Sequence, residues 1–182
     1  MKRVACYLAP GFEESEALMT VDILRRADVY VDLIGVFDKH VVGSHDIEVV
    51  TDKLWDNQLA NYDMIFLPGG QPGTNNLLNN ERVIEILQRY NKEDRLIAAI
   101  CAAPLVLDRA GLLNGKRVTS FPGVEDGNFL KSEYVEDKVV VDGNIITSRG
   151  VATIPEFAFT LLEVLDIDPQ PYQEAMLFKK TT

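Results

Sequence analysis

The chain has 182 residues, of which 47% are hydrophobic and 25% are charged, a composition typical of one globular domain and unlike that of disordered or collagenous chains. Its 28 acidic and 18 basic side chains give a net charge of −10, which argues against nucleic acid and anionic membranes as partners. We therefore expect a single domain over residues 1–182 that meets small neutral or reactive molecules.

The amino-terminal apolar run is too short for the core of a signal peptide. No apolar stretch approaches the ~20 residues that a membrane helix needs, so we expect a cytoplasmic protein with no membrane partner. In that reducing compartment the two cysteines, Cys6 and Cys101, are expected to be free thiols. They lack metal-type spacing with the two histidines, His40 and His45, so we expect no metal site.

The amino-terminal half alternates apolar runs with helical patterns. Residues 4–8 predict a buried strand that ends at Pro10 and Gly11. Residues 13–27 predict a helix, because apolar side chains recur there at helical spacing. Further strands are expected at 29–36, 47–51 and 64–67, and a further helix around 83–90.

The carboxy-terminal half continues this alternation. We expect a strand at 96–100, a helix at 104–110, a hairpin at 139–146 and a helix around 158–165. Asp142 and Gly143 are the turn signal of the hairpin, and Thr153 is expected to cap the last helix. Apolar strands between amphipathic helices predict a doubly wound α/β fold: a mostly parallel sheet with helices on both faces and a hairpin near the C-terminal third.

Cys101 follows a predicted buried strand that turns directly into a helix. The helix begins within a few residues, because Pro104 is tolerated only in a first helical turn. Ala99 and Ala103 are small, as the tight turn of a nucleophile elbow requires. We expect the helix start to favour a thiolate and lower the pKa of the cysteine. The alternative is a cysteine that only packs, which is the role we expect for Cys6 in the first strand.

Gly69 and Gly70 follow the strand at 64–67 and are predicted at the same edge of the sheet, because parallel strands end together there. Glycine lets a backbone approach a ligand closely, and free N–H groups there could hold an oxyanion beside Cys101. The alternative is a tight turn that merely needs glycine.

Three carboxylates, Glu13, Glu14 and Glu16, lie at the start of the first predicted helix. Acidic side chains there complement the helix dipole, which is a sufficient reason for their presence. A functional role requires one of them to lie beside Cys101, where burial would raise its pKa and let it hold or transfer a proton.

Segments 11–16, 67–70, 98–104 and 141–150 together resemble the ThiJ/PfpI superfamily, and in particular the branch of the Parkinson-disease-associated protein deglycase and its bacterial relatives. The resemblance spans nearly the whole chain. It implies a flavodoxin-like sandwich, a homodimer and no cofactor. The site residues that it implies are Cys101 as nucleophile, Glu16 as a protonated acid hydrogen-bonded to the thiolate, the Gly70 and Ala102 amides as an oxyanion pocket, and Gly69 and Arg149 as candidates for substrate binding.

The chain departs from this family in its histidines. Many relatives place a histidine after the strand that follows the elbow, where this chain has Phe121. His40 and His45 lie around a turn predicted at Gly43, and we interpret them as surface residues away from the elbow. A cysteine–histidine protease or amidotransferase is therefore not expected, and Glu16 remains the main candidate for proton transfer.

Three functions follow from these residues. The first is glyoxalase-type conversion of small reactive aldehydes, or deglycation of early adducts, by a Cys101 thiolate with Glu16 as proton shuttle. The second is an oxidative-stress sensor or chaperone whose thiol is oxidised to a sulfinate beside Glu16, with little turnover. The third is a hydrolase reaction of the wider superfamily, which needs a histidine from another subunit.

Overall fold

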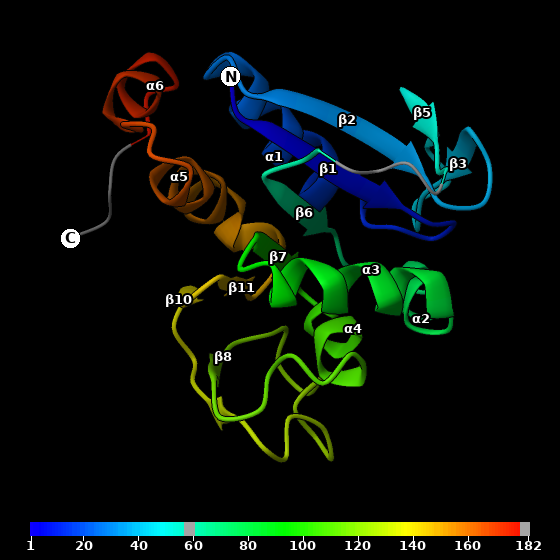
Figure 1. Ribbon diagram of the computed structural model, residues 1–182. Coiled ribbons are helices and arrows are strands. Elements are labelled where there is room, and N and C mark those ends of the chain that lie inside the picture. The colour runs from blue at the N-terminus through cyan, green and yellow to red at the C-terminus, as the bar shows by residue number, and fades with distance from the viewer. Residues whose placement is uncertain (57–60, 179–182) are drawn as a thin grey trace.

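The computed structural model describes residues 1–56 and 61–178, and its centre is one twisted sheet (Figure 1). The strands of this sheet are β1 (Arg3–Leu8), β2 (Tyr30–Gly35), β5 (Lys53–Leu54), β6 (Met64–Leu67), β7 (Leu96–Ile100), β10 (Val139–Asp142) and β11 (Ile145–Ser148). They are ordered β10-β11-β7-β6-β1-β2-β5. Neighbouring strands run parallel except β10 and β11, which form the antiparallel hairpin. The mostly parallel sheet of the predicted fold class is confirmed.

Helices cover both faces of the sheet (Figure 1). They are α1 (Glu14–Arg26), α2 (Gly73–Leu78), α3 (Glu81–Lys92), α4 (Pro104–Arg109), α5 (Ile154–Val164) and α6 (Gln170–Ala175), with a 3-10 turn η1 (Val151–Thr153) before α5. Two small sheets lie outside the central one, formed by β3 (His40–Val42) with β4 (Glu48–Val50) and by β8 (Arg117–Val118) with β9 (Glu133–Tyr134).

The hydrophobic core has two halves, one on each face of the sheet. Side chains alternate between the faces along β1. Val4, Cys6 and Leu8 pack with α1 and α5, whereas Ala5 and Tyr7 pack on the opposite side with α3 and α4. All five are fully buried. Cys6 is thus a core residue, as predicted.

The structure differs from the expected elements mainly at turns and short segments. The hairpin turn lies one residue later than its sequence signal, because Asp142 pairs with Ile145 and leaves Gly143 and Asn144 in the loop. Thr153 occupies the N-cap position of α5, but its hydroxyl does not cap that helix; it donates a 2.8 Å hydrogen bond to the Gly150 carbonyl. The segments α2, α6, β3, β5, β8 and β9 were not predicted.

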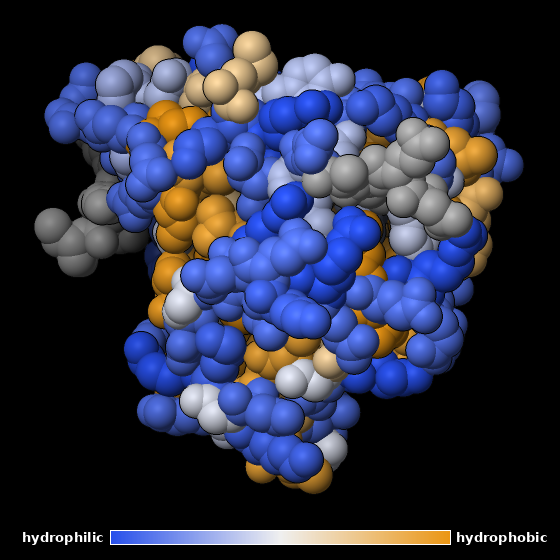
Figure 2. Space-filling view, in the orientation of Figure 1, coloured by the Kyte–Doolittle hydropathy of each residue, from blue (hydrophilic) through white to orange (hydrophobic). Residues whose placement is uncertain are grey.

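The surface is dominated by hydrophilic side chains over the face shown in Figure 2, in keeping with the net charge of −10. The longest helix among the described residues, α1, has 13 residues. Within this part of the chain, none of the helices combines the length and apolar character needed to cross a membrane.

Candidate active site

The strand-to-helix turn at Cys101 has the geometry of a nucleophile elbow. Cys101 has φ +64°, in the left-handed region that non-glycine residues rarely occupy. Its N–H donates to the Ser148 carbonyl at 3.0 Å, and its own carbonyl accepts the Phe121 N–H at 2.9 Å. Ala99 and Ala103 are fully buried beside the turn. These contacts hold the strained turn in place and set the thiol at the carboxyl edge of the sheet.

Glu16, in the first turn of α1, lies against this elbow. It is fully buried, and its Oε2 accepts the Gly69 N–H at 2.9 Å. Gly69 is wedged between the two side chains: a Cβ atom at this position would lie 2.6 Å from Cys101 Cβ and 2.8 Å from Glu16 Oε2. Glycine is therefore required here for close approach, because any side chain would push the acid and the thiol apart.

The environment of Glu16 favours the protonated carboxyl group. Burial raises its pKa to about 7, although hydrogen bonds with Cys101 and the Gly69 N–H act in the opposite direction. Its other oxygen, Oε1, is buried and makes no well-formed hydrogen bond within the described part of the chain. A carboxyl group that is protonated on Oε1 avoids placing a negative charge on this buried oxygen, in keeping with the raised pKa.

The pKa of the Cys101 thiol is raised, contrary to the lowering expected from the helix start. Burial is the largest cause, followed by the charge and hydrogen bond of an ionised Glu16, while the Ala102 and Gly70 N–H groups act to lower it. The two raising contributions of Glu16 exist only when Glu16 is ionised. The Glu16 carboxyl group and the Cys101 thiol therefore titrate as a coupled pair. Loss of the first proton leaves one negative charge that the two groups share.

A cavity of about 510 Å³ opens over the pair. Its lining combines polar site residues with an apolar rim, and consists of Glu13, Glu16, Gly70, Cys101, Phe121, Pro122, Arg149, Gly150, Val151, Ala152 and Thr153. The structure thus brings together Cys101, Glu16, Gly70 and Arg149 of the expected site. Gly69 and Ala102 lie behind the surface and contribute N–H groups.

Several lining residues were not foreseen. Phe121 was noted only as the residue in place of a histidine; its ring lies against Gly150, where an added Cβ would meet Phe121 Cδ2 at 3.3 Å. Val151 begins the η1 turn and forms part of the rim. Small, strained loop positions such as Gly150 leave no periodic pattern in the sequence, so this rim becomes visible only in the fold.

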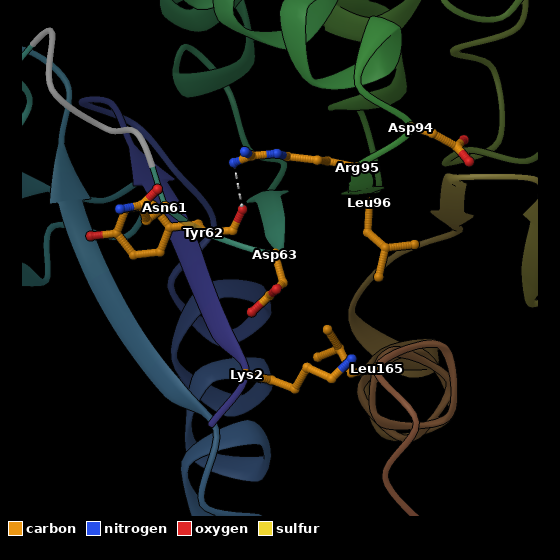
Figure 3. Close-up of a pocket in the computed structure, with 8 residues that line it drawn as sticks. All are labelled: Lys2, Asn61, Tyr62, Asp63, Asp94, Arg95, Leu96 and Leu165. Carbon is orange, nitrogen blue, oxygen red and sulfur yellow. Dashed lines mark hydrogen bonds between the residues drawn. The ribbon is translucent and has the colours of Figure 1, made fainter.

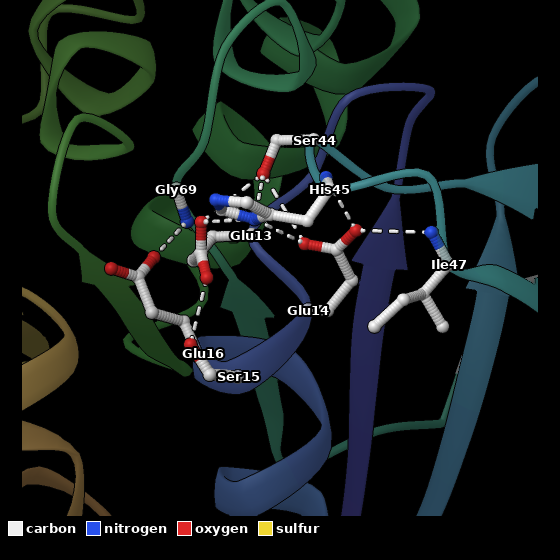
Figure 4. Close-up of polar contacts among 8 residues, drawn as sticks. All are labelled: Glu13, Glu14, Ser15, Glu16, Ser44, His45, Ile47 and Gly69. Carbon is white, nitrogen blue, oxygen red and sulfur yellow. Dashed lines mark hydrogen bonds and ion pairs between the residues drawn. The ribbon is translucent and has the colours of Figure 1, made fainter.

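Both histidines are exposed, as expected, and neither lines the Cys101 cavity; only the turn assignment of His40 changes. His40 lies in β3 rather than in a turn, and is exposed. His45 does lie in an exposed turn, but the fold brings its ring to the start of α1, where Nδ1 is 3.0 Å from Glu14 Oε2 and 3.4 Å from Glu13 Oε2 (Figure 4). His45 thus contacts Glu13, which lines the Cys101 cavity, but does not line the cavity itself.

A second cavity of about 480 Å³ lies at the opposite edge of the sheet, by the amino ends of β6 and β7 (Figure 3). Its charged side chains, Lys2, Asp63, Asp94 and Arg95, surround a space without a thiol. Lys2 pairs with Asp166 at 3.1 Å outside it. Because sites in parallel sheets form at the carboxyl ends of strands, the Cys101 cavity is the better candidate for catalysis.

Comparison with known proteins links the whole fold to one family. A model of the DJ-1/PfpI family matches residues 2–164. The chain is 40% identical to protein dj-1beta of Drosophila melanogaster over 167 residues, which are 90% of this chain and 89% of the fly protein. It is 39% identical to the Parkinson disease protein 7 homolog of Danio rerio over 171 residues, again 90% and 89% of the two chains.

Solved structures agree with these sequence relatives. The crystal structure of Drosophila melanogaster DJ-1beta has a TM-score of 0.93 and 37% identity to this chain, covering 98% of both. A DJ-1 superfamily protein from Salmonella typhimurium, crystallised as a cysteine-to-alanine mutant, also has a TM-score of 0.93 at 37% identity, covering 98% of this chain and 100% of the other. Both the α/β fold class and the resemblance found in the sequence are confirmed.

Proposed function

Because the chain belongs to the DJ-1/PfpI family, we propose that it is a stress-response enzyme whose Cys101 thiol acts on small reactive aldehydes or on early glycation adducts. The observation that carries the proposal is the pairing of a strained, partly buried thiol with a buried acid beneath one cavity. Strained backbone and raised acid pKa values are features that gather at functional sites.

The reaction begins with addition of sulfur to an aldehyde. The Cys101 Sγ–C bond forms as the π bond of the aldehyde C=O breaks. The thiol proton passes through Glu16 to the former carbonyl oxygen, which becomes the hydroxyl group of the hemithioacetal. We assign the Gly70 and Ala102 N–H groups, which act to lower the pKa of the Cys101 thiol, to stabilising the negative oxygen as it develops.

With methylglyoxal as substrate, Glu16 then removes the proton from the hemithioacetal carbon and returns a proton to the neighbouring carbon. This oxidises the first carbon to a thioester and reduces the second to an alcohol, so no external oxidant or reductant is needed. Water cleaves the thioester to give a hydroxy acid and the free thiol. We assign Arg149, on the cavity wall, to substrate binding.

The test is turnover of methylglyoxal by three proteins: the wild type, Cys101→Ala and Cys6→Ala. We expect Cys101→Ala to abolish product formation. Cys6→Ala should retain it, because Cys6 is fully buried in the core between β1 and α1. Full activity in Cys101→Ala would refute the thiol mechanism. Equal loss of activity in both variants, with intact circular dichroism, would show that the loss is not specific to Cys101 and would also contradict the mechanism.

A second candidate function is oxidative sensing by the same thiol. It is favoured by the absence of a histidine from the residues that line the described cavity, which leaves Glu16 as the main group for proton transfer. Peroxide treatment followed by intact-mass analysis separates the two functions. A stable gain of two oxygens on Cys101 without aldehyde turnover supports the sensor, and turnover without this product supports the enzyme.

We further propose that the protein acts in the cytoplasm as a homodimer, as the family resemblance implies. Light scattering after size-exclusion chromatography tests the dimer, since a single chain has a mass of 20.3 kDa.

A further inference from the structure

Two carboxylates and an imidazole from separate segments converge in Figure 4, and one of them, Glu13, also lines the Cys101 cavity. Glu13 and Glu14 come from the start of α1, and His45 comes from the turn between β3 and β4. The Oε2 atoms of Glu14 and Glu13 lie 3.0 and 3.4 Å from His45 Nδ1. The Ser44 hydroxyl lies 3.1 and 3.2 Å from the Oε2 atoms of Glu13 and Glu14. Within residues 1–56 and 61–178, this is the grouping whose ligand atoms all come within 4.8 Å of one another.

Donors to Oε1 orient each carboxylate, and its Oε2 faces the imidazole and the Ser44 hydroxyl. Glu14 Oε1 accepts the backbone N–H groups of His45 at 2.7 Å and Ile47 at 3.4 Å. Glu13 Oε1 accepts the Ser15 hydroxyl at 2.7 Å. Outer hydrogen bonds of this kind fix the orientation of metal-ligating side chains.

The charges in this cluster are unbalanced. The Glu13 and Glu14 side chains are only 16% and 6% exposed, and in the described part of the chain neither forms an ion pair with lysine or arginine. Their one cationic neighbour is the His45 ring, which is 69% exposed and positive only when protonated. Two nearly buried carboxylates are costly without a cation, and a single ring proton can be given to only one of them.

We propose that Glu13 Oε2, Glu14 Oε2 and His45 Nδ1 form a binding site for a divalent transition-metal ion of the zinc type. Atoms bound to tetrahedral zinc at about 2.0–2.1 Å lie roughly 3.3 Å apart, which agrees with the 3.0 and 3.4 Å spacings found. An imidazole ligand favours zinc, cobalt, nickel or copper over magnesium and calcium. The exposed ring gives the ion a path to the site. The Ser44 hydroxyl lies 3.1 Å from Glu13 Oε2, 3.2 Å from Glu14 Oε2 and 3.1 Å from His45 Nδ1, where the fourth atom around the ion would lie.

The test is calorimetric titration of the full chain with zinc chloride in a Cys101→Ser background, which removes the thiol as a competing ligand. We expect one zinc ion per chain. His45→Ala and Glu13→Gln should each weaken the affinity at least about tenfold, since even outer-shell changes cost about 10–100-fold. The matched control is His40→Ala, because His40 is also exposed but faces only one carboxylate, Glu48, at 3.4 Å; its affinity should be unchanged.

The histidine ring protons give a second readout by NMR, since the chain has two histidines. Zinc should shift the His45 signals at one equivalent and leave those of His40 in place. The proposal is overturned if zinc does not saturate a site, if His45→Ala and Glu13→Gln bind as well as the parent protein, or if His40→Ala weakens binding as much as they do.

Discussion

Replacement of Glu16 by glutamine should make the protein more stable, and increasingly so as the pH rises. In the unfolded chain a glutamate has a pKa near 4.5, whereas burial raises the pKa of Glu16 in the folded protein to about 7. The stability that Glu16 contributes is therefore fully present below about pH 4.5 and is lost as the pH rises through about 7. Glutamine can still accept the Gly69 N–H, but it never carries the buried charge.

One pKa unit corresponds to about 1.4 kcal/mol, so the free energy of unfolding of Glu16→Gln should gain about 2–3 kcal/mol over that of the wild type between pH 5 and pH 8. Urea unfolding followed by circular dichroism measures both proteins across this range, with a metal chelator and a reductant present.

Glu14→Gln is the matched control, because the pKa of Glu14 is lowered in the folded protein and its loss should change the free energy of unfolding in the opposite direction. Although burial acts to raise it, hydrogen bonds from backbone N–H groups and His45 hold the pKa of Glu14 below its ordinary value. This variant should be less stable than the wild type at pH 7, and the gap should stay constant down to the unfolded pKa and narrow only as the pH falls below it, through the lower folded pKa. If the Glu16→Gln and wild-type curves run parallel within about 0.5 kcal/mol, Glu16 is not a buried acid with a raised pKa and the reasoning fails.

Three further predictions concern single contacts. Gly69→Ala places a Cβ 2.6 Å from Cys101 Cβ and should lower the free energy of unfolding by about 1–3 kcal/mol; an unchanged melting temperature would contradict the close packing. Iodoacetamide should label Cys101 of the native protein and not the fully buried Cys6, with peptide mass analysis as the readout and equal labelling as the contrary result. Lys53→Met leaves the buried Asp32 without the 2.8 Å hydrogen bond from Lys53 Nζ and should cost about 1–3 kcal/mol in urea unfolding, whereas a neutral effect would mean that Tyr62 alone satisfies this carboxylate.

Long apolar patterns made much of the fold predictable. The predicted strands at 64–67 and 96–100 coincide with β6 and β7, because a short apolar run between turn signals is typical of an interior strand of a parallel sheet. Short edge segments such as β5 and β8, each two residues long, have too few residues to show a pattern. Their pairing depends on the strand beside them rather than on their own composition.

The same distinction applies to the site. Cys101 and its small neighbours were recognisable because an elbow imposes local constraints on adjacent residues. The contact of Glu16 with Cys101 depends on Gly69, which lies 53 positions from Glu16, and only the family resemblance singled out this acid. The approach of His45 to Glu14 spans 31 positions and left no local signal, so the sequence did not predict this contact.

The most direct test of the Cys101–Glu16 pair is the conversion of methylglyoxal in D2O, followed by proton NMR, for the wild type and Glu16→Gln. If Glu16 moves the proton between the two substrate carbons faster than its carboxyl group exchanges with solvent, the wild type should form lactate that keeps protium at C2, whereas deuterium at C2 would show exchange with solvent during the transfer. Glu16→Gln should then form lactate about 10²–10⁴ times more slowly, while its thiol still reacts with iodoacetamide. Lactate formation at the wild-type rate in Glu16→Gln would contradict the role assigned to the pair.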